Sequence, residues 1–308
     1  MASGIATNRT NISLPAEVSA EIIQKAQDAS AVMQLARQIA LPGRGLSIPV
    51  ITSDPEAAWV AETGKKPTAN PGLSTKTMTP YKLAVIVPFS DEFARDARAL
   101  YDALVDRLPG ALAKKFDETV FGGAAPGSGF DVFTGCTAQS IDKDASGNGG
   151  FYSALVAADI DVASSGYDVN GFAMSAQARG EMLSALDKDG RPIFINNVSD
   201  GAVPRLLGQP VVYSKGLYKA GHAASGVSGQ TGYVPATPDV LGVAGDWTKA
   251  LYGTVEGVKI DISNQATLTI GTGVVNLWEH NMFAVKAEIE VGFVADTAAF
   301  NRIVRTHA

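Results

Sequence analysis

Residues 54–92, DPEAAWVAETGKKPTANPGLSTKTMTPYKLAVIVPFSDE, hold two apolar segments separated by a polar tip. Residues 57–61 predict one strand, and residues 75–87 predict a longer one whose apolar side chains alternate from Tyr81 onward. The tip contains two glycines and two prolines and has nothing to bury. The pattern therefore predicts a two-stranded ribbon.

Such a ribbon needs a surface to lie on. A two-stranded ribbon is only marginally stable alone in water, so its apolar side chains must be covered by other parts of the same molecule or by a neighbouring molecule. The residue pattern by itself leaves these two possibilities equally open.

Helical patterns flank the ribbon on both sides. Residues 15–38 carry apolar side chains at helical spacing, and residues 47–52 predict a short strand. Residues 90–121 predict a helix of about 32 residues, which at roughly 1.5 Å per residue would span about 48 Å. We expect Pro109 to kink that helix or to split it in two, because proline has no N–H to donate.

Beyond residue 124 the pattern mixes helices and strands, so we expect an α+β fold. Helices are expected at residues 153–165 and 176–186, and a long loop at residues 219–238. Strands are expected at residues 169–174, 209–214, 240–244, 251–254, 258–262, 267–270, 275–291 and 300–304.

The composition favours a folded chain with a substantial core. Of the 308 residues, 46% are hydrophobic and 18% are charged, unlike those of a disordered chain. The formal net charge of −6 makes the chain a poor general binder of polyanions, because phosphate contacts need concentrated Lys and Arg. No stretch approaches the roughly 20 apolar residues of a membrane span, so we expect no membrane partner.

The residue types that carry catalysis or bind metals form no motif here. The single cysteine, Cys136, permits neither an internal disulfide nor a cysteine-based zinc site. The three histidines, His222, His280 and His307, lie far apart in the sequence, and we expect His222 and His307 to be solvated. We therefore predict that the chain is not an enzyme and has no catalytic, cofactor-binding or metal-binding residue.

Two stretches resemble the beginnings of known binding motifs. Residues 271–273, Gly-Thr-Gly, begin like a dinucleotide-binding loop, but Asn276 stands where the third glycine should be. Residues 142–147 begin like a calcium loop, whose twelfth position would be Ser153 instead of a bidentate Glu. A turn is the better interpretation of both stretches.

Short motifs in a fixed order resemble one protein family. AAWVAETG at residues 57–64 and KTMTPYKLA at residues 76–84 resemble the extended loop of the Hong Kong 97-type major capsid proteins of tailed bacteriophages. PFSDE at residues 88–92 resembles the start of the spine helix in that family. Three later motifs also resemble it: LLGQPVV at residues 206–212, VAGDW at 243–247 and NMFAVKAE at 281–288.

The resemblance covers the chain from about residue 14 to residue 304 and implies the α+β phage capsid fold. The implied parts are an N-terminal arm (1–14), the first part of a peripheral domain (15–53), an extended β-hairpin loop (54–88), a long spine helix (89–128), an axial domain (129–271) and the second part of the peripheral domain (272–308).

In that family the extended loop lies across an adjacent subunit, which would supply the surface that the ribbon needs. The implied intersubunit contacts come from Trp59, Glu62, Lys65, Lys66, Lys76 and Tyr81. Hinges for the expansion of a precursor shell are expected at Gly64, Pro71, Gly72 and Pro109.

The resemblance implies a shell protein that assembles with many copies of itself. Its pentamers and hexamers would form the icosahedral head of a tailed phage around double-stranded DNA, held without sequence specificity. Portal and scaffolding proteins, and in some phages a decoration protein, would be its partners, with assembly in the host cytoplasm and a final location in the virion.

Three alternatives stay open on the sequence. They are an encapsulin-like nanocompartment shell, another phage structural protein such as a decoration or tail component, and a soluble α/β hydrolase. A chain that stays a monomer or dimer under every condition would favour the hydrolase, whereas co-purifying cargo proteins would favour the nanocompartment.

Overall fold

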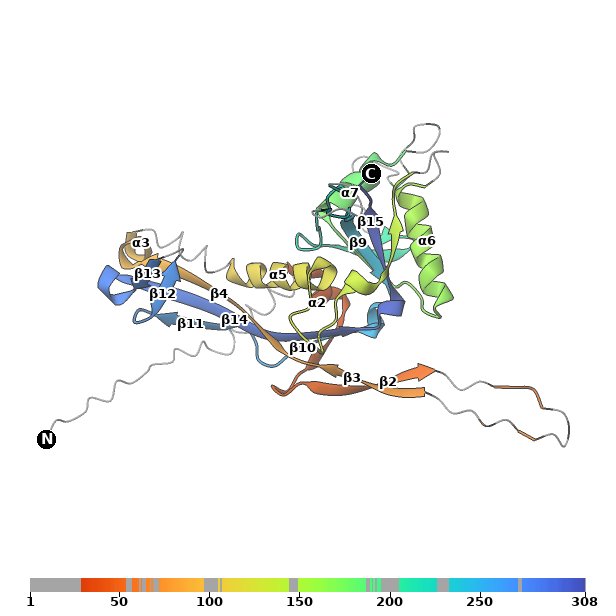
Figure 1. Cartoon of the computed structure of the whole chain (residues 1–308), viewed down its shortest axis with the longest axis horizontal. Helices are drawn as coiled ribbons and strands as arrows, with labels where there is room; N and C mark the ends of the chain where they lie inside the picture. Colours follow the sequence, from red (N-terminus) through yellow and green to blue (C-terminus); the bar gives the residue numbers. More distant parts are fainter. Residues whose placement is uncertain are drawn as a thin grey trace.

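The computed structural model describes most of the chain. The described residues are 29–53, 57–60, 62, 65, 66, 68, 72–96, 105, 107–143, 149–186, 189, 191, 193, 194, 205–225, 233–270 and 273–307. They form an elongated molecule, with a long sheet along its length, a compact α/β part towards one end and a projecting ribbon (Figure 1).

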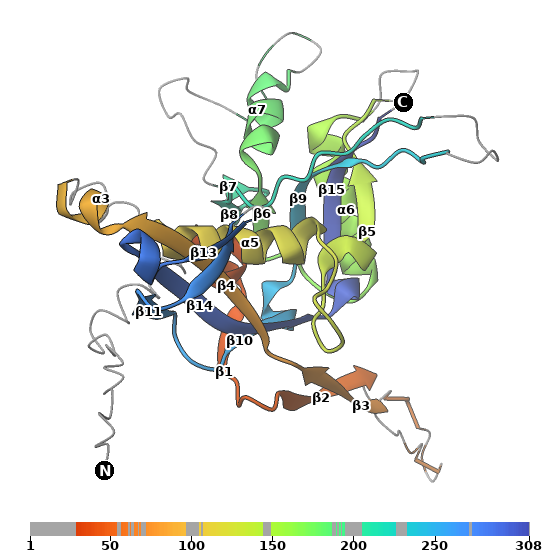
Figure 2. The same ribbon diagram turned by 60° about the vertical axis from the view of Figure 1, so that its left-hand side comes forward.

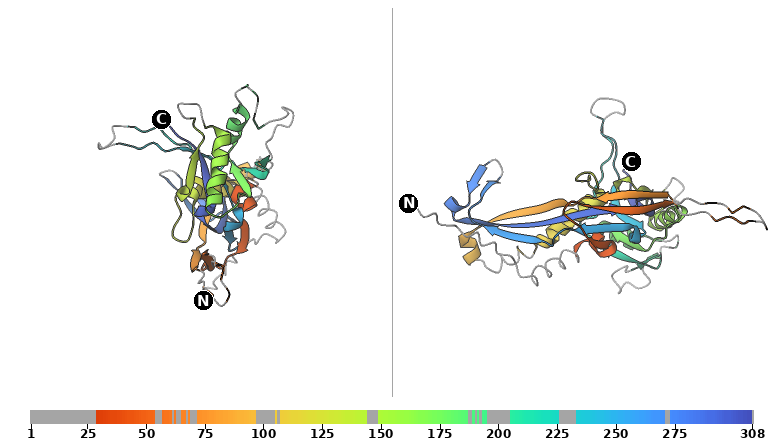
Figure 3. Two further views of the ribbon diagram at one scale, coloured as in Figure 1. Left: turned by 90° about the vertical axis from the view of Figure 1, so that its right-hand side faces the viewer. Right: turned by 90° about the horizontal axis from the view of Figure 1, so that it is seen from below.

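The long sheet is built around β14 (Met282–Ala295), which pairs along both of its edges. Along one edge runs β4 (Tyr81–Ser90), which is antiparallel to β14 over ten residue pairs. Along the other edge lie β10 (Ala250–Thr254) and β11 (Lys259–Ser263), also antiparallel to β14. β1 (Arg37–Ala40) extends the sheet by pairing in parallel with β10. Figure 3 shows β4, β14 and β11 side by side.

The inner face of the long sheet is apolar because β14 alternates. Its side chains at alternate positions from Val285 to Phe293 are buried and belong to the main core. This face packs on α5 (Leu108–Gly122), where Phe116 meets both Phe130 and Phe293 edge-on, with ring centroids 6.3 Å apart. Aromatic packing of this kind stabilises a core beyond simple area burial.

The outer face of the long sheet is charged and balanced across neighbouring strands. Lys82 of β4 lies 3.1 Å from Glu290 of β14, and Lys286 of β14 lies 3.0 Å from Asp261 of β11. Opposite charges facing each other across strands support the register of the sheet.

The compact part contains a six-stranded sheet in the order β5-β15-β9-β6-β8-β7. Its strands are β5 (Thr137–Ser140), β6 (Gly171–Met174), β7 (Arg205–Leu206), β8 (Gln209–Tyr213), β9 (Asp239–Gly245) and β15 (Phe300–Arg305). α6 (Phe151–Ser164) and α7 (Ala176–Ser184) share a buried cluster with Phe172 and Met174 of β6. Ala173, on the other face of β6, belongs to the main core, so this core joins the two sheets.

Short elements complete the fold. They are α2 (Ala31–Leu35), α3 (Asp91–Asp96), the hairpin of β12 (Thr267–Ile270) and β13 (Gly273–Asn276), and 3-10 turns at Phe133–Gly135, Trp247–Lys249, Trp278–His280 and Thr297–Ala299.

Most of the elements predicted beyond residue 150 are confirmed to within a few residues, but two segments there differ. The loop predicted over residues 219–238 is partly paired: residues 219–225 pair with residues 234–240 through three isolated bridges, and the two segments project from the compact part (Figure 2). The strand predicted over residues 275–291 is divided, because Asn281 adopts a left-handed conformation (φ 49°) between β13 and β14.

The ribbon pairs different strands from those predicted. β2 (Leu46–Ser53) pairs antiparallel with β3 (Gly72–Met78), and residues 57–60 lie outside any strand. The prediction of one strand over residues 75–87 was wrong, because Thr79 and Pro80 separate β3 from β4. β4 then leaves the ribbon and pairs with β14, and its alternating apolar side chains pack, partly buried, against the main core.

The helix predicted over residues 15–38 ends early. Ser30 has an extended backbone, and its Oγ accepts a hydrogen bond from the Met33 N–H, so it caps the separate short helix α2. α2 ends at Leu35, and residues 37–40 form β1. The first part of the predicted helix, residues 15–28, lies outside the described residues.

The helix predicted over residues 90–121 begins as α3 and ends as α5. Arg107 lies in a turn before α5, and Pro109 falls in the first turn of that helix. Proline is well tolerated there, because the first N–H groups of a helix have no intrahelical partner. Pro109 therefore starts a helix, in line with the expected split, while residues 97–104 and 106 lie outside the described part.

Candidate assembly surface

The ribbon of β2 and β3 projects from the body at the end of the long sheet that carries the compact part (Figures 1 and 3). Its strands pair from Leu46↔Met78 at the base to Ser53↔Gly72 at the far end. Only the base can be held by the body, so the contacts made there set the direction in which the ribbon points.

Met78 anchors the base of the ribbon in a hollow of the long sheet. Its side chain is fully buried, in a cluster with Leu41 and Val294. The hollow exists because Gly253 of β10 and Gly292 of β14 face each other across the strands. A Cβ on Gly253 would lie 2.9 Å from the Met78 Sδ, and one on Gly292 would lie 2.8 Å from the Met78 Cγ. Two glycines thus make room for one methionine.

Lys76, two residues before Met78 in β3, makes a second attachment to the body. Its Nζ donates a hydrogen bond to the Ala295 carbonyl (2.6 Å) and lies 2.7 Å from the Asp131 Oδ2. Asp131 also accepts a hydrogen bond from the Ala295 N–H (3.0 Å). One carboxylate therefore joins β3 to the end of β14.

Tyr81 also makes its contacts within its own chain. Its hydroxyl donates to the Ser128 carbonyl (2.7 Å), and its ring meets Phe130 edge-on. For Lys76 and Tyr81, the part in an intersubunit contact stays a prediction, and the structure adds an intramolecular role for each.

The other loop residues proposed for intersubunit contact point into solvent. The Trp59 side chain is fully exposed (105%), and Val60 beside it is 40% exposed. Glu62, Lys65 and Lys66 are exposed as well.

The four candidate hinges occupy different settings. Gly72 is the half-buried first residue of β3, and Pro109 is buried in the first turn of α5. Gly64 and Pro71 lie outside the described residues. Whether these positions act as hinges stays a prediction.

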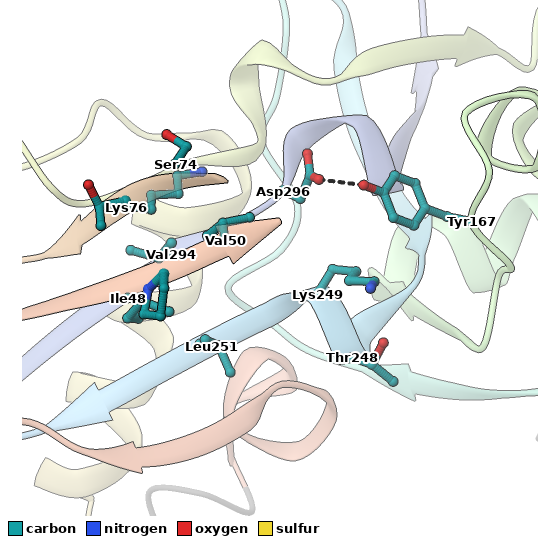
Figure 4. A pocket seen from close by; sticks show the side chains of 12 residues that line it. Ile48, Val50, Ser74, Lys76, Tyr167, Thr248, Lys249, Leu251, Val294 and Asp296 are labelled. Carbon is teal, nitrogen blue, oxygen red and sulfur yellow. Dashed lines mark hydrogen bonds between the residues drawn. The ribbon is translucent and has the colours of Figure 1, made fainter. Parts of the chain in front are cut away.

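A cleft of about 640 Å³ separates the ribbon from the body (Figure 4). Apolar side chains from three strands, β2, β10 and β14, line it: Ile48, Val50, Leu251 and Val294. Polar side chains complete the lining: Ser74, Lys76, Tyr167, Thr248, Lys249 and Asp296.

The polar side of the cleft is held in place by contacts of its own. The Tyr167 hydroxyl donates to the Asp296 Oδ2 (2.7 Å), and the Lys249 Nζ lies 5.5 Å from the centre of the Tyr167 ring. The cleft thus has an apolar floor and a positively charged group at its rim, an arrangement suited to an aromatic side chain.

A buried carboxylate that the sequence analysis missed connects three parts of the chain. Asp117 of α5 is fully buried and accepts hydrogen bonds from the hydroxyls of Ser30 and Ser214, both at 2.6 Å. It also accepts from the backbone N–H groups of Ala31 (2.9 Å) and Val32 (3.4 Å). Burial raises the pKa of this carboxyl, although the hydrogen bonds act in the opposite direction.

Comparison with known proteins identifies the family. The model of the phage capsid family matches residues 11–304. The chain belongs to the phage capsid family. This confirms the resemblance inferred from the motifs around the ribbon and the start of α3.

Sequence relatives of this phage capsid family member carry capsid names. "Probable major capsid protein gp17" of Mycobacterium phage L5 is 28% identical over 325 residues, covering 96% of this chain and 90% of the relative. The "Major capsid protein" of Staphylococcus phage 80alpha is 26% identical, covering 94% of this chain and 83% of the relative.

Solved structures share the fold of this capsid family chain. A chain from Mycobacterium phage Bobi superposes with a TM-score of 0.72 at 18% identity, covering 100% of this chain and 96% of that one. A chain from Microbacterium phage Oxtober96 superposes with a TM-score of 0.70 at 24% identity, covering 90% and 91%.

A second polar cluster in the capsid protein lies where the C-terminal strand meets the projecting pair of segments. Asp239 is almost completely buried and accepts hydrogen bonds from the Gly221 N–H, the Arg305 guanidinium and the His307 ring. Burial raises the pKa of Asp239, but these hydrogen bonds prevail and bring it to about 2. The expectation that His307 is merely solvated was wrong, because its ring lies 2.9 Å from Asp239.

Cys136 and Asp142 of this capsid protein make contacts within the fold. Cys136 is buried, and burial raises the pKa of its thiol to about 12. Asp142, which opens the calcium-like stretch, accepts hydrogen bonds from Ser140 and Thr306. Within the described ranges, no three His, Cys, Asp or Glu side chains gather in a way that could hold a metal ion. Over the same ranges, no helix is both long and apolar enough to cross a membrane.

Proposed function

We propose that this chain is the major capsid protein of a tailed phage, which assembles through pentamers and hexamers into an icosahedral shell around double-stranded DNA. The geometry of the ribbon supports this function: buried Met78 anchors its base, and a fully exposed Trp59 lies beyond its far end. A fully exposed tryptophan contributes no buried surface to its own chain, and tryptophan is a typical anchor of a protein interface. The names of the relatives from phages L5 and 80alpha support the same role.

The proposed layout keeps the domains that the motifs imply: a peripheral domain (15–53 and 272–308) that holds β14, a spine helix (89–128) that includes α5, and an axial domain (129–271) that holds α6, α7 and the strands β5 to β9. The ribbon belongs to the extended loop, which lies across an adjacent subunit. Each intersubunit contact can be weak, because a symmetric shell repeats it many times and the binding free energies of all the copies sum.

The charge of the chain supports the proposed contents, and membership of the capsid family supports the proposed partners. A net charge of −6 and the balanced outer face of the long sheet suit a container that encloses DNA without gripping it. A portal and a scaffolding protein complete the head, with assembly in the host cytoplasm, and a decoration protein is an optional further partner.

Removal of the loop tip tests the proposal. A chain lacking residues 65–71 keeps both strands of the ribbon and all of the body, so we expect it to fold. Its circular dichroism and melting temperature should match those of the full chain. Negative-stain electron microscopy and gradient sedimentation should show shells for the full chain and none for the shortened one. Normal shells from the shortened chain would contradict the role of the loop, and a full chain that never assembles, even with scaffolding protein, would contradict the function.

A further inference from the structure

Two features of the molecule complement each other but do not meet within one copy. One is the exposed segment that contains Trp59, Val60 and Glu62, and the other is the cleft between the ribbon and the body. We propose that the cleft of one copy receives the Trp59 side chain of a second copy, with Glu62 paired to Lys249. This inference rests on the proposed function and names the surface on which the loop would dock.

The cleft has the size and lining that an indole requires. Its volume of about 640 Å³ lies within the roughly 300–1,000 Å³ of pockets that enclose organic groups. Ile48, Val50 and Leu251, labelled in Figure 4, contribute apolar side chains to its lining. An aromatic ring that enters would exchange water for these side chains, the exchange that drives association of apolar surfaces.

The rim is already organised around an aromatic ring. Lys249 lies over Tyr167, whose hydroxyl is fixed by Asp296, and Asp296 in turn accepts a hydrogen bond from the Ala298 N–H (3.1 Å). Because these side chains hold one another, docking would require little reordering of the rim. A second ring beside Lys249 would face the same cation.

The charges of the two features are opposite. Glu62 follows Trp59 by three residues and is exposed, as is Lys249 at the rim of the cleft. Lys76, the other lysine of the lining, is paired with Asp131 in its own chain, which leaves Lys249 as the natural partner for an incoming carboxylate. An electrostatic match of this kind fixes the register of an interface.

The occupant comes from a second copy because of the direction of the ribbon. The cleft lies beside the middle of the ribbon, along Ile48 to Val50 and Ser74 to Lys76, whereas Trp59 follows the far end of β2 at Ser53 and is fully exposed. Figure 1 shows both strands leading away from the body. A contact in which one surface of each copy meets a different surface of the next is head-to-tail, and it closes into a ring when the rotation per copy allows.

Cysteine cross-linking between separately made chains provides a direct test. The single native cysteine, Cys136, is buried with a raised pKa, so engineered surface thiols would react without interference. One chain carries Val60→Cys, which keeps Trp59, and the other carries Thr248→Cys at the rim. Mixed under assembly conditions with mild oxidation, they should form a disulfide-linked dimer on non-reducing gels.

A matched control uses Ile160→Cys in place of Thr248→Cys, because Ile160 is exposed (62%) on α6, away from the cleft lining. The proposal predicts a higher yield of linked dimer when the Val60→Cys chain is mixed with Thr248→Cys than when it is mixed with Ile160→Cys. Equal yields in the two mixtures would overturn the proposal. A chain carrying both Val60→Cys and Thr248→Cys provides a second check. A disulfide within that chain, seen as a faster-running monomer in place of linked oligomers, would show that Trp59 enters its own cleft and would also overturn it.

A charge exchange tests the predicted pair. Glu62→Lys and Lys249→Glu should each reduce the yield of assembled particles, and the double variant should recover it. Failure of the double variant to exceed both single variants would refute the Glu62–Lys249 pair. The outcomes are separable from the proposed function: shells without the Val60–Thr248 cross-link defeat only this inference, whereas a wild-type chain that forms no shells defeats the function itself.

Discussion

Replacement of Asp117 provides a quantitative test of how the chain is held together. The carboxylate accepts four hydrogen bonds, two from hydroxyls and two from the backbone at the start of α2. In Asp117→Ala the hydroxyls of Ser30 and Ser214 can rotate towards other acceptors, but the N–H groups of Ala31 and Val32 cannot.

The expected loss follows from those two N–H groups. A buried donor left unpaired costs about 1–3 kcal/mol, so two of them cost about 2–6 kcal/mol. The longer bond from Val32 (3.4 Å) and the relief of burying a carboxylate reduce this sum. We expect Asp117→Ala to lower the free energy of unfolding by about 2–4 kcal/mol. The unpaired N–H groups account for this loss because they are buried away from water.

Asp117→Asn is the matched variant. Its carbonyl oxygen, in the place of Oδ2, can still accept from the Ala31 N–H and the Ser214 hydroxyl, while its NH₂ group, in the place of Oδ1, can donate to the Ser30 Oγ once that hydroxyl rotates. Only the Val32 N–H then loses its acceptor. We therefore expect a smaller loss, of about 1–2 kcal/mol. Urea denaturation of the unassembled chain measures both values. An Asp117→Ala chain as stable as wild type, or an Asp117→Asn chain less stable than Asp117→Ala, would refute the reasoning.

The pH dependence gives an independent check with a definite sign. Burial raises the pKa of Asp117 above its ordinary value of 3.8, so the folded chain retains this proton to a higher pH than the unfolded chain does. Stability from this group therefore falls as pH rises from the ordinary value through the raised one. Asp117→Asn cannot titrate, so the stability gap between wild type and this variant should narrow as pH rises through that window. A stability difference that widens as pH rises would mean that the hydrogen bonds, and not burial, determine the pKa of the Asp117 carboxyl.

Three further predictions concern the ribbon and the C-terminal strand. Gly292→Ala should cost about 1–3 kcal/mol of unfolding free energy, because its Cβ would lie 2.8 Å from Met78, whereas Gly43→Ala meets nothing within 4 Å and should be near neutral in the same urea titration. Lys76→Met should cost about 1 kcal/mol or less, since the pair is partly exposed, yet it should speed limited proteolysis of the ribbon. Asp239, with a pKa of about 2, contributes stability above its ordinary value of 3.8 that is lost as pH falls through 2, so Asp239→Asn should flatten the fall in melting temperature over that range.

Apolar periodicity and boundary residues in the sequence predicted the position of several helices and strands. α6, α7, β6 and β8 lie within a few residues of their predicted positions, since each has its own apolar periodicity and a clear boundary. Pro109 marked a helix boundary because its missing N–H is tolerated only at the first turn.

The sequence did not predict which strands pair with each other. The alternation from Tyr81 onward marked a half-buried strand correctly, but its partner, β14, is about 200 residues away in the chain. The apolar run at residues 57–61 resembled the other strand of the ribbon, and residues 46–53 took that place. Periodicity reports that a face is buried and does not report what covers it.

Asp117 was missed although the sequence carries a signal for it. It follows Ala113 by four residues and precedes Val120 by three, so an acidic residue stands on the apolar stripe of α5. A charge in such a place needs several donors, but Ser30 and Ser214 come from distant segments that only the fold brings together.

The geometry of the ribbon's base has a consequence for assembly. A head-to-tail contact closes a ring only if each copy presents its loop at a fixed angle, and a long lever amplifies any change at its pivot. Here the pivot is a methionine seated between two glycines and a lysine bound to a carboxylate beside it, while the far end carries the exposed tryptophan. Interior packing of this density resists small displacements. In the proposed head-to-tail contact, the residues at the base of the ribbon would set the angle between copies, and the residues beyond its far end would set the strength of the contact.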